Sequence, residues 1–324
     1  MQAYPSWLSV LLLLIAVVGF LSNVLVIVNI FKSRFLHDVT HYLILNLAVS
    51  DGLCCFIFGL EMFMDLLNYP NNRTGGIAEI LYCRLINGNY VFQSFAFISA
   101  YNLVIISLER YIGIVKPLRY VQICNKAHTW LAIFLSWVLG SCVYLLHLIG
   151  VQYLESETEF NIRCRNKHPW QWHFLSFTVG FVAPLLIMIW AYSRIIKALK
   201  QSALNQAVSA QAAETREATK RVVHLMLIVT ITYAVLYVPT QPVYIIIVSV
   251  NQQDFEQLPL GILLTDILTK LPVLLNSIAN PFIYAFKYKK FRKGMRDLMC
   301  RCAKNTISPN EDVMMQVDTA NSNI

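Results

Sequence analysis

The stretch that decides the fold is WLSVLLLLIAVVGFLSNVLVIVNIF at residues 7–31, which holds 25 residues and no charged side chain. A helix needs about 20 mainly apolar residues to cross the hydrocarbon core of a bilayer. The alternative interpretation is a secretory signal peptide, whose apolar part usually measures about 7–15 residues and follows a basic leader. Residues 1–6 hold no lysine or arginine. We therefore predict a retained transmembrane helix.

Six further apolar stretches follow, at residues 42–67, 87–111, 128–149, 172–196, 222–250 and 258–286. The chain of 324 residues is 57% hydrophobic and 14% charged, with a mean hydropathy of +0.54. Soluble domains carry about 25% charged residues, so this composition excludes a single soluble core. The sequence predicts an all-α integral membrane protein with a bundle of seven transmembrane helices at residues 7–286.

The net charge of +8 would also suit a protein that binds nucleic acid. Its distribution favours a membrane protein instead. With the N-terminus outside, the inner segments carry 20 of the 26 lysines and arginines, and the outer segments carry six. Basic residues concentrate on the cytoplasmic side of membrane proteins. We expect a multi-pass protein of the plasma membrane, with residues 1–6 extracellular and no nucleic-acid partner.

Five polar residues lie at comparable depth in four of the predicted spans. Ionisable groups inside a span are costly, so the mid-span Asp51 is a candidate functional residue. With it lie Asn23, Ser99, Asn276 and Asn280. The five could form a hydrated cluster that holds a cation or a proton, or could act only through interhelical hydrogen bonds. The residues by themselves leave both interpretations open.

Only two of the eight cysteines, Cys83 and Cys164, fall on the expected outer, oxidising side. They form a disulfide or remain free thiols, and we expect the disulfide. Asn72 begins a glycosylation sequon, NRT, on the same side.

The later spans contain Pro184, Pro239 and Pro281, which remove helix hydrogen bonds and favour kinks. Arg110 lies at the inner end of its span beside Glu109, which lowers the cost of its charge there. An arginine that only extends toward the membrane surface is the alternative.

In order along the chain, these residues resemble the signature set of rhodopsin-like G protein-coupled receptors. The set comprises GFLSN (19–23), LNLAVSD (45–51), ERY (109–111) with PL (117–118), Trp137, Pro184 with Tyr192, and NPFIY (280–284). Phe291 and the basic run through Arg296 resemble the short amphipathic eighth helix, here residues 287–302. Cys300 and Cys302 resemble its lipidation sites. A cytoplasmic tail follows at residues 303–324.

The resemblance implies a receptor rather than an enzyme: an extracellular ligand opens a cleft for a heterotrimeric G protein. The residues implied in this switch are Glu109, Arg110, Tyr111, Tyr192, Asn280, Pro281 and Tyr284. The Asp51 cluster resembles the family's allosteric sodium site, with Asp51, Ser99, Asn276 and Asn280 as ligands. No other cofactor is implied.

The sixth predicted span departs from the family. It reads LYVP at 236–239, so Tyr237 replaces the usual tryptophan, Tyr233 replaces a phenylalanine, and Ala100 stands opposite in place of a larger residue. Thr219 stands where many members carry a glutamate that pairs with the arginine of the third span. Glu217 would face about 200° away. We therefore expect a weaker restraint on Arg110 and some basal signalling. Cys83 also lies two residues farther from Arg110 than usual.

The ligand is predicted mainly by exclusion. Phe92 stands where aminergic receptors carry an aspartate, and Leu274 stands where opsins carry the retinal lysine, one turn from Lys270. Sequences around residues 219–223 and 276–286 most resemble peptide receptors. Glu61 and Lys270 are expected to form a buried ion pair or to anchor the ligand. The full predicted pocket is Glu61, Phe92, Gln93, Tyr237, Gln241, Tyr244 and Lys270.

Other functions remain open at this point. A receptor for a small non-peptide or lipid ligand shares every motif above. A transporter, channel or opsin-like pump could use Asp51 and Lys270, although no second mid-span carboxylate and no inverted repeat is present. Neither HExxH nor GxSxG occurs, which disfavours an intramembrane enzyme.

Overall fold

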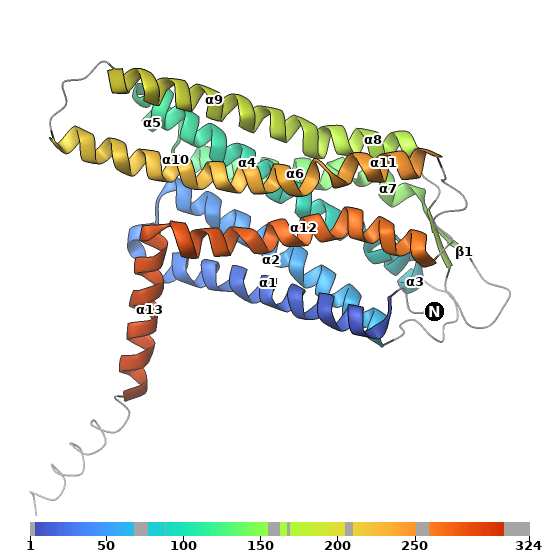
Figure 1. The fold of residues 1–324 in the computed structure, drawn as a ribbon. Helices are drawn as coiled ribbons and strands as arrows, with labels where there is room; N and C mark the ends of the chain where they lie inside the picture. Colours follow the sequence, from blue (N-terminus) through green and yellow to red (C-terminus); the bar gives the residue numbers. More distant parts are fainter. Residues whose placement is uncertain are drawn as a thin grey trace, which may run out of the picture.

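The structure is a computed structural model that describes residues 4–67, 77–87, 89–154, 163–166, 169–204, 210–250 and 259–307. Within these residues the chain forms a bundle of long helices lying side by side (Figure 1). Six segments of this described part are long and apolar enough to cross a membrane. A further helix, α12 (Pro259–Lys287), has 29 residues and lies beside them. Its length of about 43 Å exceeds the roughly 30 Å of a bilayer core.

The first half of the bundle is built around one central helix. Helix α4 contacts α2, α6 and α9, and α1 packs along α2. Gly140 permits the close approach of α6 to α4, because a Cβ there would lie 2.5 Å from Ile98 Cγ1. The elements are α1 (Ser6–Lys32), η1 (Arg34–Leu36), α2 (Val39–Leu66), α3 (Ile77–Tyr82), η2 (Cys83–Asn87), α4 (Tyr90–Val115), α5 (Pro117–Ile123) and α6 (Lys126–Val143).

The later predicted spans are interrupted helices. Tyr144 separates α6 from α7, a π-helical segment joins α8 to α9, and Val238 and Pro239 separate α10 from α11. Helix α13 turns away from the bundle at a steep angle (Figure 1). The elements are α7 (Leu145–Gly150), α8 (Trp170–Phe177), η3 (Thr178–Val182), α9 (Ala183–Leu204), α10 (Ala210–Tyr237), α11 (Thr240–Val250) and α13 (Lys289–Ile307).

Three prolines free a backbone carbonyl four residues earlier, because proline has no N–H to donate. In each case a side chain from another helix donates to that carbonyl, so each proline site also joins two helices. The pairs are Tyr233 Oη to the Gly180 oxygen at 3.3 Å (Pro184), Gln241 Nε2 to the Leu268 oxygen at 3.2 Å (Pro272), and Asn23 Nδ2 to the Ser277 oxygen at 3.1 Å (Pro281).

Two strands lie at one end of the bundle, which we call the hairpin end, where composition predicted only helices. Strands β1 (Val151–Leu154) and β2 (Arg163–Asn166) pair antiparallel, with Tyr153 opposite Cys164. Cys83 begins η2 nearby; it is fully buried and disulfide-bonded. The side chain of its expected partner, Cys164, lies outside the described residues, so the pairing stays a prediction.

Helix boundaries differ from the predicted ones mainly beyond the apolar stretches. Helix α4 continues one turn past Tyr111, and α10 begins at Ala210, twelve residues before the predicted sixth span. Helix α13 reaches Ile307, so the predicted tail of residues 303–324 begins inside a helix. The polar residues of these extensions can form helix in water, where an apolar pattern is not required.

Candidate functional site

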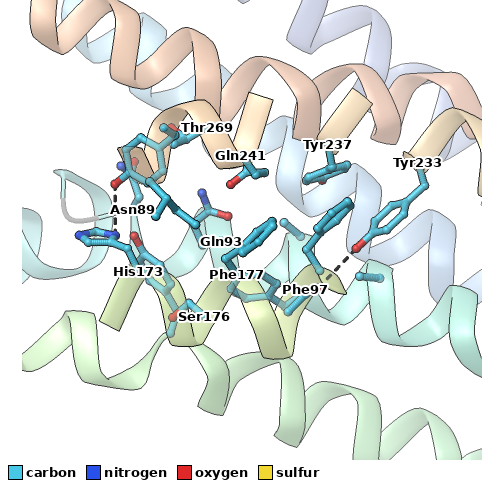
Figure 2. Close-up of a pocket in the computed structure, with 17 residues that line it drawn as sticks. Asn89, Gln93, Phe97, His173, Ser176, Phe177, Tyr233, Tyr237, Gln241 and Thr269 are labelled. Atoms are coloured by element: carbon cyan, nitrogen blue, oxygen red, sulfur yellow. Dashed lines mark hydrogen bonds between the residues drawn. The ribbon is translucent and has the colours of Figure 1, made fainter. Parts of the chain in front are cut away.

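A cavity of about 90 Å³ opens within the bundle toward the hairpin end, between α4, the α8–η3 segment, α10, α11 and α12 (Figure 2). Polar side chains from four helices meet there, including Gln93, His173, Gln241 and Thr269. Aromatic rings, among them Phe97, Phe177, Phe181, Tyr233 and Tyr237, line its deeper part. Ligand pockets commonly combine an apolar floor with a few directed polar groups.

The shape of the cavity floor follows from Pro184. Its missing N–H frees the Gly180 carbonyl in η3, which accepts the hydroxyl of Tyr233. Gly180 also lets the Phe97 ring pack against the backbone, because a Cβ there would lie 2.2 Å from Phe97 Cε1. A π-helical segment of this kind often lies at a functional site. The floor thus joins α4, η3 and α10, which belong to the third, fifth and sixth long helical segments of the chain.

Tyr237 lies at the position where the family usually carries tryptophan. Its ring is 5.3 Å from Phe181 and 4.7 Å from Tyr233, measured between ring centroids. The three rings form a cluster between η3 and α10, and Tyr237 is the last residue of α10 before the break at Pro239. Ala100 and Tyr237 both line the cavity, so the small side chain leaves room where a larger residue would pack.

Four of the seven predicted pocket residues line the cavity: Gln93, Tyr237, Gln241 and Tyr244. Phe92 does not. Its ring is 1% exposed and packs against Phe58 of α2, with the centroids 5.8 Å apart. Adjacent residues on a helix point about 100° apart, so Gln93 faces the cavity and Phe92 faces α2.

Glu61 and Lys270 form an ion pair between α2 and α12, in which the Lys270 ammonium donates to Glu61 Oε1. The Lys270 side chain is 3% exposed and that of Glu61 is 16% exposed. Neither residue lines the cavity, but Thr269, next to Lys270, does. The sequence predicted either a buried ion pair or a ligand anchor, and the structure shows the buried ion pair.

The Asp51 cluster lies in the middle of the bundle. The carboxylate of Asp51 is fully buried and accepts hydrogen bonds from Ser277 Oγ at 3.0 Å and Asn280 Nδ2 at 2.8 Å. Ser99 Oγ and Asn276 Oδ1 are buried and make no hydrogen bond to the described residues. Sequence reasoning missed Ser277 because serine within an apolar span carries little signal by itself.

The second polar site, the Arg110 network, lies near the end of α4 opposite the cavity. The guanidinium of Arg110 donates to both carboxylate oxygens of Glu109 and to the hydroxyl of Thr40 in α2. Tyr120 of α5 donates its hydroxyl to Glu109 Oε1 at 2.6 Å. Burial raises the pKa of Tyr120, and the hydrogen bond to the Glu109 carboxylate raises it further, so the phenol remains a neutral donor.

Among the described residues, no side chain of α10 forms a hydrogen bond or an ion pair with Arg110. Glu217 instead pairs with Lys220 at 2.7 Å, and both side chains are exposed. The other predicted switch residues lie nearby in the bundle. Tyr192 accepts a hydrogen bond from Ser107 at 3.2 Å, Tyr111 packs on Trp190, and the buried Tyr284 hydroxyl makes no hydrogen bond to the described residues.

Helix α13 is attached through a polar chain at the same end. Tyr288 and His41 Nε2 lie 2.8 Å apart, and His41 Nδ1 lies 2.6 Å from Asp38 Oδ1. Burial raises the pKa of Asp38, but the hydrogen bonds and charge of His41 outweigh this and lower it to about 2. Asn29 Nδ2 also donates to the Phe291 carbonyl at 3.0 Å.

The predicted modification sites are described only in part. Cys300 is an exposed free thiol on α13. The side chain of Cys302 and all of Asn72 lie outside the described residues.

The model of the family described as 7 transmembrane receptor (rhodopsin family) matches residues 22–284. The chain is 27% identical to the allatostatin-A receptor of Bombyx mori, over 88% of this chain and 77% of that one. It is 27% identical to neuropeptide FF receptor 1 of Homo sapiens, over 88% and 67% respectively. It is 23% identical to the green-sensitive opsin of Gallus gallus, over 93% and 82%.

Proposed function

Since this chain belongs to the rhodopsin family of seven-transmembrane receptors, we propose that it binds an extracellular peptide and activates a heterotrimeric G protein. One observation supports this most strongly. The helices α4 and α10 line the cavity at one end and continue to the opposite end, where α4 carries Arg110. A change at the cavity can therefore reach a cytoplasmic surface through two continuous helices.

A peptide is the preferred ligand for two reasons. Two of the similar proteins are named as receptors for allatostatin-A and for a neuropeptide. The cavity of about 90 Å³ is small beside the roughly 300–1,000 Å³ of pockets that enclose whole small ligands. One end of a peptide would insert between Gln93 and Gln241, and the rest would contact the surface above.

An opsin-like function has less support. Leu274 stands where opsins carry the retinal lysine, and the ammonium of Lys270 is occupied by Glu61. A receptor for a small non-peptide or lipid ligand remains the alternative, and no described contact favours it over a peptide.

The proposed mechanism uses the break at Pro239 as a joint. A ligand that contacts Gln241 and Tyr244 of α11 and Tyr237 of α10 shifts the population toward another arrangement of these two helices. It does so only by the difference in its affinity for the two arrangements. Outward movement of the start of α10 would then open the end of the bundle beside Arg110. The G protein would bind there once Arg110 leaves Glu109 and Thr40.

We also propose a sodium ion at the Asp51 cluster. The carboxylate of Asp51 and the buried oxygens of Ser99 and Asn276 are the hard oxygen donors that such cations prefer. Asn280 and Ser277 hold the carboxylate in place. A bound cation would supply a positive charge that favours the closed cluster.

The membrane topology follows as a further proposal. The N-terminus lies outside the plasma membrane and α13 lies inside along the bilayer, anchored through acyl chains on Cys300 and Cys302. Cys83 and Cys164 form the outer disulfide, and Asn72 carries a glycan.

A peptide screen with G protein activation as readout tests the function directly. A true agonist activates the wild type and loses its effect in Arg110→Ala, although the variant still binds it at the cell surface. A peptide that binds but leaves every G protein subtype unaffected would contradict the proposal.

A further inference from the structure

Two histidines and a tyrosine from three helices meet at one wall of the cavity. His147 Nε2 of α7 lies 3.3 Å from His173 Nδ1 of α8, and the hydroxyl of Tyr244 of α11 lies 3.2 Å from the same nitrogen. His147 is fully buried, and His173 and Tyr244 are each 9% exposed. His173 and Tyr244 line the cavity, so an ion inside the cavity can reach the group. Figure 2 shows the position of His173 in this lining.

The packing fixes the orientation of both imidazoles. Tyr144 stacks on His147, with ring centroids 3.8 Å apart and planes 3° apart. Trp172 and His173 meet the same ring edge-on, and Tyr244 meets His173 at 88°. The two nitrogens therefore face each other because their rings are held by aromatic neighbours. Side chains whose rotamers are locked by packing can bind a metal ion with little rearrangement.

Hydrogen bonding alone suits this arrangement poorly. A ring nitrogen carries either one proton or one lone pair, so it forms one good hydrogen bond. His173 Nδ1 nevertheless has two neighbours at hydrogen-bond distance, His147 Nε2 and the Tyr244 hydroxyl. A cation placed between the three atoms would satisfy all of them at once.

We propose that His147 Nε2, His173 Nδ1 and the Tyr244 oxygen bind a zinc ion. Zinc binds imidazole nitrogen at about 2.0–2.1 Å in tetrahedral geometry, which places neighbouring ligand atoms about 3.3 Å apart. The two measured separations, 3.3 and 3.2 Å, match two edges of such a tetrahedron. Because His173 and Tyr244 line the cavity, the fourth position could be filled from it by water or by an oxygen of a bound ligand. Imidazole ligands also suit copper and nickel. Zinc is the first ion to test because the two separations match a tetrahedral site.

The affinity should be moderate. Among the described residues, no three His, Cys, Asp or Glu side chains gather as a metal site, so this one has two strong ligands and a phenol. Zinc binding displaces the proton of the Tyr244 phenol and any proton on the two ligating imidazole nitrogens, and these protons pass to solvent. Binding should therefore weaken as the pH falls.

Zinc would connect α11, the segment after Pro239, to α7 and α8. The three proposed zinc ligands lie close together in the arrangement in which Arg110 donates to Glu109 and Thr40. A ligand stabilises the arrangement that it binds best, so zinc should lower basal G protein activation. This consequence rests on the proposed function, whereas the metal site does not.

The binding test uses the full chain, purified in detergent micelles. Zinc sulfate is titrated in competition with a chromogenic zinc indicator, and cobalt(II) alone is added to a second sample. We expect one zinc per receptor, and a visible cobalt spectrum of the tetrahedral type. Loss of a partner that only orients a metal ligand costs about 10–100-fold in affinity, so His147→Ala and His173→Ala should lose at least this much.

Further variants and a melting-temperature measurement separate zinc binding at this site from zinc binding elsewhere on the protein. Tyr244→Phe should reduce affinity less than either histidine variant. His224→Ala, which removes an exposed histidine of α10, is the matched control and should bind as the wild type does. If His147→Ala fails to fold, His147→Gln replaces it. Zinc should also raise the melting temperature of the wild type and of His224→Ala, but not that of folded His147 and His173 variants.

The proposal is overturned if the wild type and the His147 and His173 variants take up zinc equally, or if none binds it in a saturable way. Zinc binding without any effect on basal G protein activation would still support the metal site. That outcome would contradict only its consequence for signalling.

Discussion

Lys270 of α12 donates a hydrogen bond to the carboxylate of Glu61 in α2, and this ion pair lies beside the cavity rather than in its wall. Both side chains are largely shielded from solvent. Removal of one partner from a buried pair leaves an uncompensated charge, which typically costs about 3–5 kcal/mol. The pair therefore has a structural role. An additional role in ligand binding can be detected only in a variant that changes both residues, because a single change also leaves an unpaired buried charge.

The double variant Glu61→Gln/Lys270→Met removes both charges and avoids a lone buried one. We expect near-normal surface expression and a large loss of agonist potency, because the pair adjoins Thr269, which lines the cavity, and loss of the pair would change the cavity wall there. The two single variants should lose expression as well. Dose–response curves and surface immunolabelling measure both effects. Normal potency in the double variant would leave the pair a purely structural role.

Glu109→Gln should raise basal G protein activation several-fold. The substitution weakens the contacts of Arg110 and Tyr120, and α10 offers no described contact to replace them. Tyr120→Phe should raise basal activity less, because it removes one hydrogen bond and no charge. Second-messenger output without agonist, normalised to surface expression, measures the effect.

Glu217→Gln is the matched control for that experiment, because Glu217 is an exposed carboxylate of α10 that pairs with Lys220. Such pairs on a helix surface contribute about 0.2–0.5 kcal/mol. Its basal output should equal that of the wild type. Basal output that rises with Glu217→Gln and stays flat with Glu109→Gln would mean that α10 restrains Arg110 after all.

Tyr233→Phe should favour the active arrangement modestly. The hydroxyl joins α10 to the Gly180 carbonyl that Pro184 frees, and a neutral hydrogen bond contributes about 0.5–1.5 kcal/mol. A loss of this size corresponds to roughly a two- to tenfold shift in the population of the two states. Basal activity should rise accordingly. Unchanged activity together with an unchanged melting temperature would remove this bond from the switch.

Asp51→Asn should abolish the effect of sodium on basal activation. In the wild type, sodium chloride should lower activation relative to the same concentration of N-methylglucamine chloride, because the cation stabilises the closed cluster. The variant keeps an oxygen beside Ser277 and Asn280 but lacks the charge that attracts the ion. Equal sodium sensitivity in both proteins would place the cation elsewhere.

The seven-helix fold could be predicted from sequence because apolar length alone requires it. Residues 7–31 have no other stable environment than a bilayer or a protein core of similar size. The depths of Asp51, Asn280 and Arg110 then follow from counting along helices. The break at Pro239 could also be expected, because proline favours a kink. The interruption at Tyr144 is less predictable, because hydropathy continues unchanged across it.

Side-chain partners were harder to predict than positions. Thr40 and Tyr120 reach the Arg110 network only because α2 and α5 approach α4 at one end, which no local pattern encodes. His147 and His173 likewise meet across two helices. By contrast, the Glu61–Lys270 pair was one of two alternatives that the sequence offered, since ionisable groups inside a membrane span favour pairing.

The misplaced Phe92 has a local cause. Cys83 lies two residues farther from Arg110 than the family pattern expects, which makes the helix register at this end uncertain. The π-helical η2 and Asn89, which has a φ of 59°, lie between Cys83 and α4 and can absorb extra residues. A shift of one residue on a helix rotates a side chain by about 100°, enough to exchange the directions of Phe92 and Gln93.

The most direct test of the account measures guanine-nucleotide exchange by purified G protein heterotrimers of each subtype, with the receptor in lipid nanodiscs and no ligand. For at least one subtype, exchange should be faster with the wild type than with empty nanodiscs, faster still with Glu109→Gln, and at the empty-disc rate with Arg110→Ala. Identical rates in all four samples for every subtype would contradict the claim that this bundle activates a G protein through Arg110.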